Sequence, residues 1–306
     1  MPPSKPKPSE IAAEAKKTYI PWIRQNMSLK CPPNSYLCYS DSIPTQPLDT
    51  GRQVHFAFYE RDPVDLAIEW ANDTSEPIDP VAIPVIMPAN DKRPGGDWEA
   101  GVMSPEECLC RRSNLFATLT TPAPGNSAPN NYPIPLKAGV FSRTVVVYRN
   151  GPEKYEIWQE PKSLPVISVC PVKRPKLDIS GKKYSFKQEK ELMRDKIRTA
   201  LRIAVYYGYY NICIGSFGLG PGFRNPTEEV ALMWRDAFLK DPEFQGHFQD
   251  VVFAFENPEG PGSGSSKSSS SKSSSSKSSS AKSTCASDLE VFKSVFKPMN
   301  IHGAFK

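Results

Sequence analysis

The sequence is poor in residue types that several common kinds of active site require. Only three histidines occur in 306 residues, which leaves little material for a Ser-His-Asp or Cys-His catalytic site. The seven cysteines are odd in number and include no C-x-x-C pair or Cys/His cluster. We therefore expect no metal and no cofactor, and we expect a reducing compartment, the cytoplasm or the nucleus.

Long apolar segments are also missing. No run of about 18 apolar residues occurs, so we expect no transmembrane helix and no membrane partner. Residues 1–8 are rich in proline and lysine, lack the apolar centre of a signal peptide, and are expected to be disordered. Nothing in the composition indicates an oligomeric state.

The remaining composition fits one large globular domain. Apolar residues make up 39% of the chain, and the net charge of +5 is partly due to a low-complexity tract. That tract, residues 258–287, is almost entirely Ser, Lys, Gly and Pro, so we expect it to be disordered. Because residues 288–298 return to an amphipathic pattern, we expect residues 9–306 to form a single domain interrupted by this insertion.

Strand and helix patterns alternate along the chain. Apolar runs predict strands at 54–58, 81–87, 144–148, 155–158, 164–170, 211–214 and 251–255. Helical spacing and capping residues predict helices at 9–27, from 62, from 104, at 186–207, from about 225 to 239, from 241 and at 288–298. Residues 28–52 and 117–142 are expected to be irregular. This order predicts an α/β fold with a mostly parallel sheet and helices on both faces.

In such a fold, ligands bind beyond the carboxyl ends of the strands, where two loops, 90–104 and 215–226, have suitable residues. The first loop leads into Ser104-Pro105-Glu106-Glu107. Its plain interpretation is a capping box, with Ser104 as N-cap and Glu107 at N3. Its functional interpretation is a pair of carboxylates beside a glycine loop, able to transfer protons on a bound anion.

The second loop contains Gly215, Gly218, Gly220 and Gly222, which allow the backbone to approach a ligand closely. A helix starting near Asn225 would add a dipole suited to phosphate. No Gly-Lys-Ser/Thr follows, so the loop is not of the Walker A type. Phe217 and Phe223 alternate with the glycines and either stack on a base or ribose or anchor the loop. Together the two loops fit a diphosphate.

Residues 171–185 form a third loop of interest, which carries several lysines and an arginine. We favour a solvated surface loop over a phosphate-contacting face for this segment.

Residues 93–107, RPGGDWEAGVMSPEE, continuing as CLCRRSNLF, resemble the signature of microbial-type poly(ADP-ribose) glycohydrolases. The family motif is three glycines, a spacer, then Gln-Glu-Glu. Gly95-Gly96-Asp97 takes the place of the glycines, and Pro105-Glu106-Glu107 that of Gln-Glu-Glu. Ala89-Asn90, GSFGLGPGF and NPTEEVA are also similar to family segments, so the resemblance spans about residues 9–256.

The resemblance implies a three-layer α/β/α macrodomain that binds ADP-ribose and cleaves an O-glycosidic bond at its distal ribose. It implies that Glu107 is the catalytic acid, that Glu106 holds ribose hydroxyls, and that Asn90 contacts the distal ribose. Both glycine loops would hold the diphosphate, and the ligand-binding set would be Asn90, Gly95, Gly96, Asp97, Gly215, Phe217, Gly218, Gly220, Gly222 and Phe223. The partners would be ADP-ribose or ADP-ribosylated protein or nucleic acid.

Two positions depart from the family pattern. Pro105 lacks the carboxamide of glutamine, and Asp97 adds a negative charge where a glycine would pass a diphosphate. These departures motivate an alternative function, a non-catalytic ADP-ribose reader. A third hypothesis is a scaffold whose Ser/Lys tract is phosphorylated or binds acidic partners.

Overall fold

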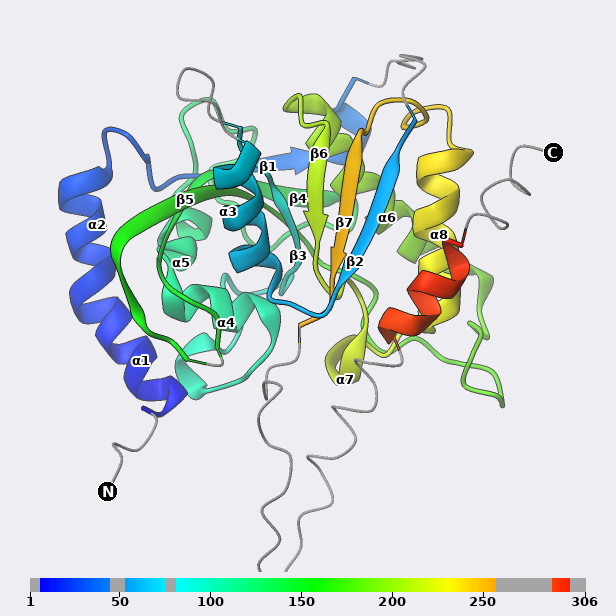
Figure 1. The fold of residues 1–306 in the computed structure, drawn as a ribbon, viewed down its shortest axis with the longest axis horizontal. Coiled ribbons are helices and arrows are strands. Elements are labelled where there is room, and N and C mark those ends of the chain that lie inside the picture. The colour runs from blue at the N-terminus through cyan, green and yellow to red at the C-terminus, as the bar shows by residue number, and fades with distance from the viewer. Residues whose placement is uncertain (1–5, 45–52, 75–80, 153, 257–287, 298–306) are drawn as a thin grey trace, which may run out of the picture.

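A seven-stranded mixed sheet forms the centre of the computed structural model, which describes residues 6–44, 53–74, 81–152, 154–256 and 288–297 (Figure 1). The strands are β1 (Tyr36–Tyr39), β2 (His55–Tyr59), β3 (Val85–Pro88), β4 (Ala138–Arg149), β5 (Ile157–Val169), β6 (Asn211–Ile214) and β7 (Asp250–Ala254). Their order is β1-β4-β5-β3-β6-β7-β2. The five strands from β5 to β2 are parallel, while β4 is antiparallel to both β5 and β1.

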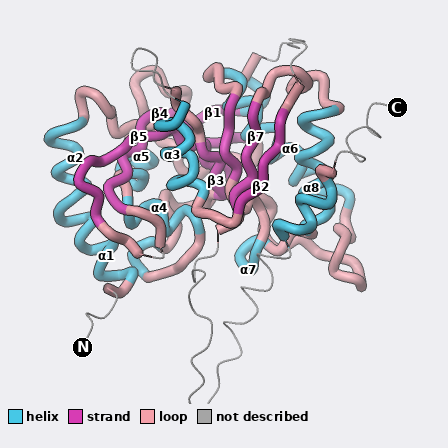
Figure 2. Tube along the Cα trace, viewed as in Figure 1, coloured by secondary structure: helices cyan, strands magenta, loops and turns pink. Residues whose placement is uncertain are grey.

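Helices cover both faces of this sheet (Figure 2). They are α1 (Pro8–Glu14), η1 (Ala15–Tyr19), α2 (Ile20–Met27), η2 (Ser40–Ser42), α3 (Pro63–Thr74), η3 (Trp98–Ala100), α4 (Pro105–Arg112), α5 (Leu115–Thr120), α6 (Lys187–Tyr206), α7 (Gly220–Phe223) and α8 (Thr227–Leu239), with a further helix over 288–295. One buried cluster joins the sheet to α6, α8 and the 288–295 helix, and another joins it to α1–α5. The expected α/β sheet covered on both faces is confirmed.

Local hydrophobic pattern located most of the strands, but not their lengths. The two strands expected at 155–158 and 164–170 are one strand, β5, which pairs antiparallel with the 12-residue β4. The residues between the two expected strands, 159–163, are largely exposed and polar, so the apolar signal is interrupted there. β1 was expected to be irregular. It is a four-residue edge strand that pairs with β4, and the two strands are far apart in the sequence.

Local sequence signals predicted some helix ends correctly and others not. α6 matches its expected bounds, and Gly208 follows it with φ of +78°. The helix expected from 241 is wrong, because residues 242–247 form turns. There the carboxylates of Asp241 and Glu243 pair with Arg198 of α6 instead. α1 begins at Pro8, inside the expected disordered segment.

Two expectations concern segments outside this description. Residues 1–5 and the Ser/Lys insertion at 258–287 lie outside the described residues. Among the helices that are described, none combines the length and apolarity needed to cross a membrane.

The 288–295 helix carries Phe292, whose exposed fraction is 2% and whose ring lies 5.2 Å from that of Phe253. We predict that Phe292→Ala lowers the free energy of unfolding by about 3–5 kcal/mol, because it removes a large buried ring and leaves a cavity. Lys293→Ala, at the exposed neighbouring position, should change it by less than about 0.5 kcal/mol. Urea unfolding measures both, and equal effects would contradict docking of this helix.

Candidate functional site

The two loops singled out in the sequence leave the same edge of the sheet. β3 lies between β5 and β6 and is parallel to both, so the carboxyl ends of all three strands meet there. Beyond the strands, Ala89 N donates to Val169 O at 3.0 Å, and Gly215 N donates to Ile86 O at 3.2 Å. The 90–104 loop and the 215–226 loop are therefore neighbours in space.

Glu106 lies beneath the first loop with an exposed fraction of 2%. Asn90 N donates to one carboxyl oxygen at 2.6 Å, and Gly95 N donates to the other at 3.2 Å. The hydroxyl of Tyr132 is 3.4 Å from that second oxygen. Burial raises the pKa of Glu106 to about 8, although these donors favour the charged form. The carboxyl group thus fixes the loop backbone at two points.

Glu107 does not form the capping box that the sequence predicts. Ser104 is the N-cap and Pro105 the first helical residue of α4, as expected, but no side-chain capping hydrogen bond is present. The Glu107 carboxylate instead accepts a hydrogen bond from Asp97 N at 3.2 Å and one from the Ser104 hydroxyl. The side chain therefore contacts both the loop and the hydroxyl of the N-cap residue, without bonding to the N-cap backbone.

Gly96 brings the loop backbone directly against this carboxylate. Its φ is +55°, and a Cβ at this position would lie 2.2 Å from Glu107 Oε1 and 3.6 Å from Asn90 Nδ2. Asn90 Oδ1 accepts hydrogen bonds from Lys92 N and Arg93 N, which orients the side chain. The amide of Asn90, the backbone of Gly96 and the carboxylate of Glu107 thus form one polar corner.

Both departures from the family pattern fit this geometry. Asp97 has φ of −102°, so its position does not require glycine. Its carboxylate pairs with Arg93 at 2.8 Å, and the side chain is 46% exposed, so its charge is balanced at the surface. Pro105 lies at the start of α4, where the missing N–H is harmless.

The glycine turns of the two loops differ in their free backbone donors. In the first loop, the N–H groups of Gly95, Gly96 and Asp97 are taken by Glu106, Arg93 O and Glu107. Both glycine loops were expected to present donors to a diphosphate. Within the described residues, the N–H groups of Ser216 and Gly218 have no acceptor, so this glycine turn keeps donors that the Gly95–Asp97 turn does not.

The glycines of the second loop differ in their surroundings. A Cβ at Gly218, where φ is +78°, would lie 2.6 Å from Met193 Cε, so the loop packs tightly there. Gly220 also has a positive φ, but neither it nor Gly222 has a described atom within 4 Å of a Cβ position. Gly215 continues the sheet through its bond to Ile86.

The two phenylalanines also differ. Phe217 is 1% exposed and packs edge-on against Trp234 at 5.6 Å, so in this structure it anchors the loop. Phe223 ends α7 and is half-buried. α8 begins at Thr227 rather than at Asn225, whose buried side chain donates to Val172 O and Gly218 O.

Two buried arginines that the sequence analysis did not single out hold the site together. Arg111 donates to Trp98 O at 2.8 Å and to Val102 O at 2.5 Å, which braces the segment leading to Ser104. Arg112, 1% exposed, pairs with Asp62 at 2.5 Å and Asp65 at 2.6 Å. The signal for them was two adjacent arginines in a short helix, of which at least one must face the core.

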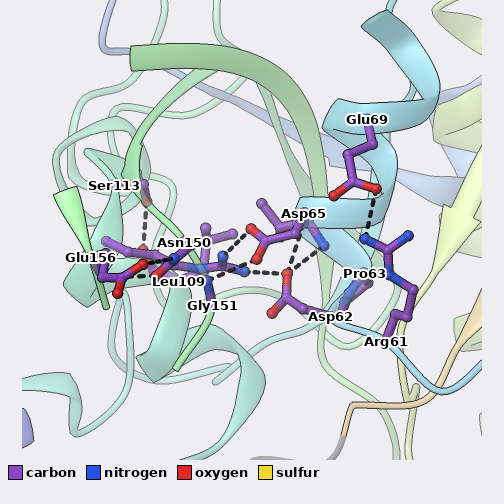
Figure 3. Close-up of polar contacts among 12 residues, drawn as sticks. Arg61, Asp62, Pro63, Asp65, Glu69, Leu109, Ser113, Asn150, Gly151 and Glu156 are labelled. Atoms are coloured by element: carbon purple, nitrogen blue, oxygen red, sulfur yellow. Dashed lines mark hydrogen bonds and ion pairs between the residues drawn. The ribbon is translucent and has the colours of Figure 1, made fainter. Parts of the chain in front are cut away.

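The aspartates that pair with Arg112 lie at the start of α3, beside the β4–β5 turn (Figure 3). Asp65 also accepts a hydrogen bond from Gly151 N at 2.8 Å. They border a cavity of about 610 Å³, lined by Glu60, Arg61, Asp62, Asp65, Ile68, Glu69, Asn150, Gly151, Pro152, Lys154, Trp158 and Glu256. The described residues contain no group of three or more His, Cys, Asp or Glu arranged to hold a metal ion.

Comparison with solved structures shows the same fold in bacterial enzymes. Poly(ADP-ribose) glycohydrolase from Thermomonospora curvata is 17% identical, with 94% of this chain and 99% of that chain covered and a TM-score of 0.67. Poly(ADP-ribose) glycohydrolase from Deinococcus radiodurans in complex with ADP-ribose is 18% identical, with coverage of 92% and 98% and a TM-score of 0.62.

A search of curated proteins gave no match. Residues 32–150 match the family model described as microbial-type PARG, catalytic domain. The matched segment contains the first loop and α4, and it ends before the second loop. Over residues 32–150, this chain is therefore similar to the microbial-type PARG catalytic domain.

Proposed function

We propose that this protein binds ADP-ribose and hydrolyses the O-glycosidic bond at the distal ribose of an ADP-ribosyl substrate, as a poly(ADP-ribose) glycohydrolase does. The position of Glu107 is the observation that carries this proposal. Its carboxylate makes no capping hydrogen bond to the helix backbone and lies in a polar corner with Asn90 and Gly96. The family model and the likeness to glycohydrolase structures support the same activity.

The two loops would bind different parts of the ligand. The diphosphate would accept hydrogen bonds from Ser216 N and Gly218 N, the unengaged donors of the second loop. The distal ribose would then lie over the Asn90–Gly96 corner of the first loop. Because the two loops leave neighbouring strands, one extended ligand reaches both.

Glu107 would act first as an acid and then as a base. As the bond between the anomeric carbon and the leaving oxygen breaks, a proton passes from Glu107 to that oxygen. Water then attacks the oxocarbenium-like ribose, and its proton returns to Glu107. The Ser104 hydroxyl can stay bonded to Glu107 throughout, because a hydroxyl both donates and accepts.

Glu106 would support this step by positioning the loop and by binding the ribose. With a pKa of about 8, its carboxyl group carries a proton near neutral pH. Both of its oxygens accept backbone hydrogen bonds from the loop. The protonated carboxyl group of Glu106 would then donate a hydrogen bond to a ribose hydroxyl.

The non-catalytic reader stays the alternative, but neither Asp97 nor Pro105 disturbs the geometry of the site. The charge of Asp97 is paired with Arg93, and Pro105 is accommodated at the helix start. We place the protein in the cytoplasm or the nucleus, which the six free thiols among the described cysteines support.

We predict that Glu107→Gln lowers the rate of ADP-ribose release from poly(ADP-ribose) by at least about 100-fold, because the glutamine has no proton to transfer. Affinity for free ADP-ribose, measured by calorimetry, should change by less than about threefold. Glu99→Gln serves as the control, since this exposed residue of the same loop has Lys16 as its one ion-pair partner in the described part of the chain. Unchanged release by Glu107→Gln would refute the mechanism, and binding without release by the wild type would favour the reader.

We predict that Gly96→Ala abolishes hydrolysis, because the added methyl group overlaps Glu107 Oε1. Gly125→Ala is the matched control, since Gly125 also has a positive φ but no described atom within 4 Å of a Cβ position. Both variants should lose about 1–2 kcal/mol of stability through backbone strain. Thermal unfolding and kcat/KM separate the two effects, and equal activity of the two variants would contradict the placement of Glu107.

We predict that stability falls as pH rises from about 4.5 to about 8, in part because of Glu106. Its pKa is raised on folding, so the folded state binds the proton more tightly, and that advantage is lost as pH rises through about 8. Glu106→Gln mimics the protonated form and should flatten the decline. Because burial also raises the pKa of Glu256, part of the decline of stability with pH should remain in this variant. Thermal unfolding of the wild type and of Glu106→Gln at pH 5, 6.5 and 8 measures the decline. Parallel plots of stability against pH for the two proteins would disprove the prediction.

A further inference from the structure

The basic segment after β5 lies between the two site loops. Lys173 pairs with Asp91 of the first loop at 2.7 Å. The next residue, Arg174, donates its backbone N–H at 2.6 Å to Phe223 O of the second loop. Residues 171–174 therefore bridge the rim of the proposed ADP-ribose site, although the sequence analysis favoured a merely solvated loop.

This rim carries an excess of positive charge. Its exposed cations are Lys92, Arg93, Lys173, Arg174 and Arg224. Two of them are balanced, since Lys173 pairs with Asp91 and Arg93 with Asp97. Among the described residues, the side chains of Lys92 and Arg174 form no ion pair, and the Arg224 guanidinium donates only to Pro221 O. Three cations at one rim are thus available to an anion.

The backbone at two of these cations is strained. Arg174 has φ of +49° and Arg224 has φ of +60°, a region that non-glycine residues rarely adopt. Tyr155 is the one other such residue in the described chain. The hydrogen bond from Arg174 N to Phe223 O ties the two strained positions together. Such strain persists only where surrounding contacts enforce it, and it concentrates at binding sites.

We propose that Lys92, Arg174 and Arg224 form a second anion site that binds the diphosphate of the adjoining unit of poly(ADP-ribose). This inference rests on the proposed function. The terminal unit occupies the main site, and the bond cleaved at its distal ribose joins it to the next unit. That next unit extends from the main site across this rim. It carries a diphosphate of its own, whose negative charge matches the three unpaired cations there.

The extent of the rim favours this polymer over a nucleic-acid duplex. The three unbalanced cations lie on segments joined by the contacts of Asp91, Lys173, Arg174 and Phe223. A duplex presents a phosphate on each strand every 3.4 Å or so and is bound by longer basic stripes. One diphosphate at a fixed distance from the reacting ribose needs only a compact site.

The test compares ADP-ribose with a defined three-unit oligomer of poly(ADP-ribose). Binding is measured by fluorescence anisotropy in the full-length Glu107→Gln background, so that the oligomer is not hydrolysed. Arg174→Gln with Arg224→Gln removes two rim cations. Arg24→Gln with Lys162→Gln is the matched control, which removes two exposed cations from α2 and β5. A single-stranded oligonucleotide with the same number of phosphates is the third ligand.

We expect the rim variant to bind the oligomer about 3- to 10-fold more weakly and ADP-ribose within twofold of the parent. The slope of log affinity against log salt for the oligomer should fall by about 1.4. The charge-matched control should bind all ligands as the parent does.

Unchanged oligomer binding by the rim variant would overturn the second site while leaving the proposed function intact. Equal losses for ADP-ribose and oligomer would also overturn it, because the arginines would then serve the main site or its fold. If the oligonucleotide binds as tightly as the oligomer and weakens equally, the rim is a general nucleic-acid surface and the proposal is wrong. Failure of the parent and the wild type to bind ADP-ribose would instead refute the proposed function.

Discussion

A buried carboxyl group, that of Glu106, determines the shape of the candidate site. Backbone N–H groups of Asn90 and Gly95 point at its two oxygens, which draws the loop down onto the start of α4. The loop therefore cannot move without leaving a buried polar group unpaired, which is costly. This constraint sets the position of Gly96, and Gly96 in turn lies against the neighbouring carboxylate of Glu107. Two adjacent glutamates thus have different surroundings, since Glu106 is bonded to the loop backbone from below and Glu107 lies in the polar corner with Gly96.

The same arrangement explains why the two glycine-containing loops are not equivalent. In the first, Gly95 N and Asp97 N donate to the carboxylates of Glu106 and Glu107, while in the second Ser216 N and Gly218 N are unengaged among the described residues. Parallel pairing of β3 and β6 brings these different loops to one edge of the sheet. A ligand that carries both an anion and a sugar can therefore meet free backbone donors at one end and an acidic side chain at the other.

Buried arginines supply the stiffness that such a site requires. Arg112 ties the end of α4 to the start of α3, and Arg111 ties the same helix to the carbonyls of the loop before it. Removing one member of a buried ion pair costs several kcal/mol, so these contacts hold α4 firmly in place. The helix that carries both glutamates is therefore fixed at its first turn by the loop and at its last turn by these ion pairs.

Local sequence alone predicted the fold class, and it located the two loops and the pair of glutamates that make up the candidate site. Buried runs such as 211–214, the helix ending before Gly208 and the Pro105 helix start are all local signals, because neighbouring residues decide them. Tertiary structure decided what those residues do. Whether Glu107 caps its helix or faces a ligand depends on a loop ten residues away, and whether Phe217 stacks or anchors depends on Trp234. The pairing of β1 with β4 and the bridge from Arg174 to Phe223 were likewise hidden, because they join segments that only the folded sheet brings together.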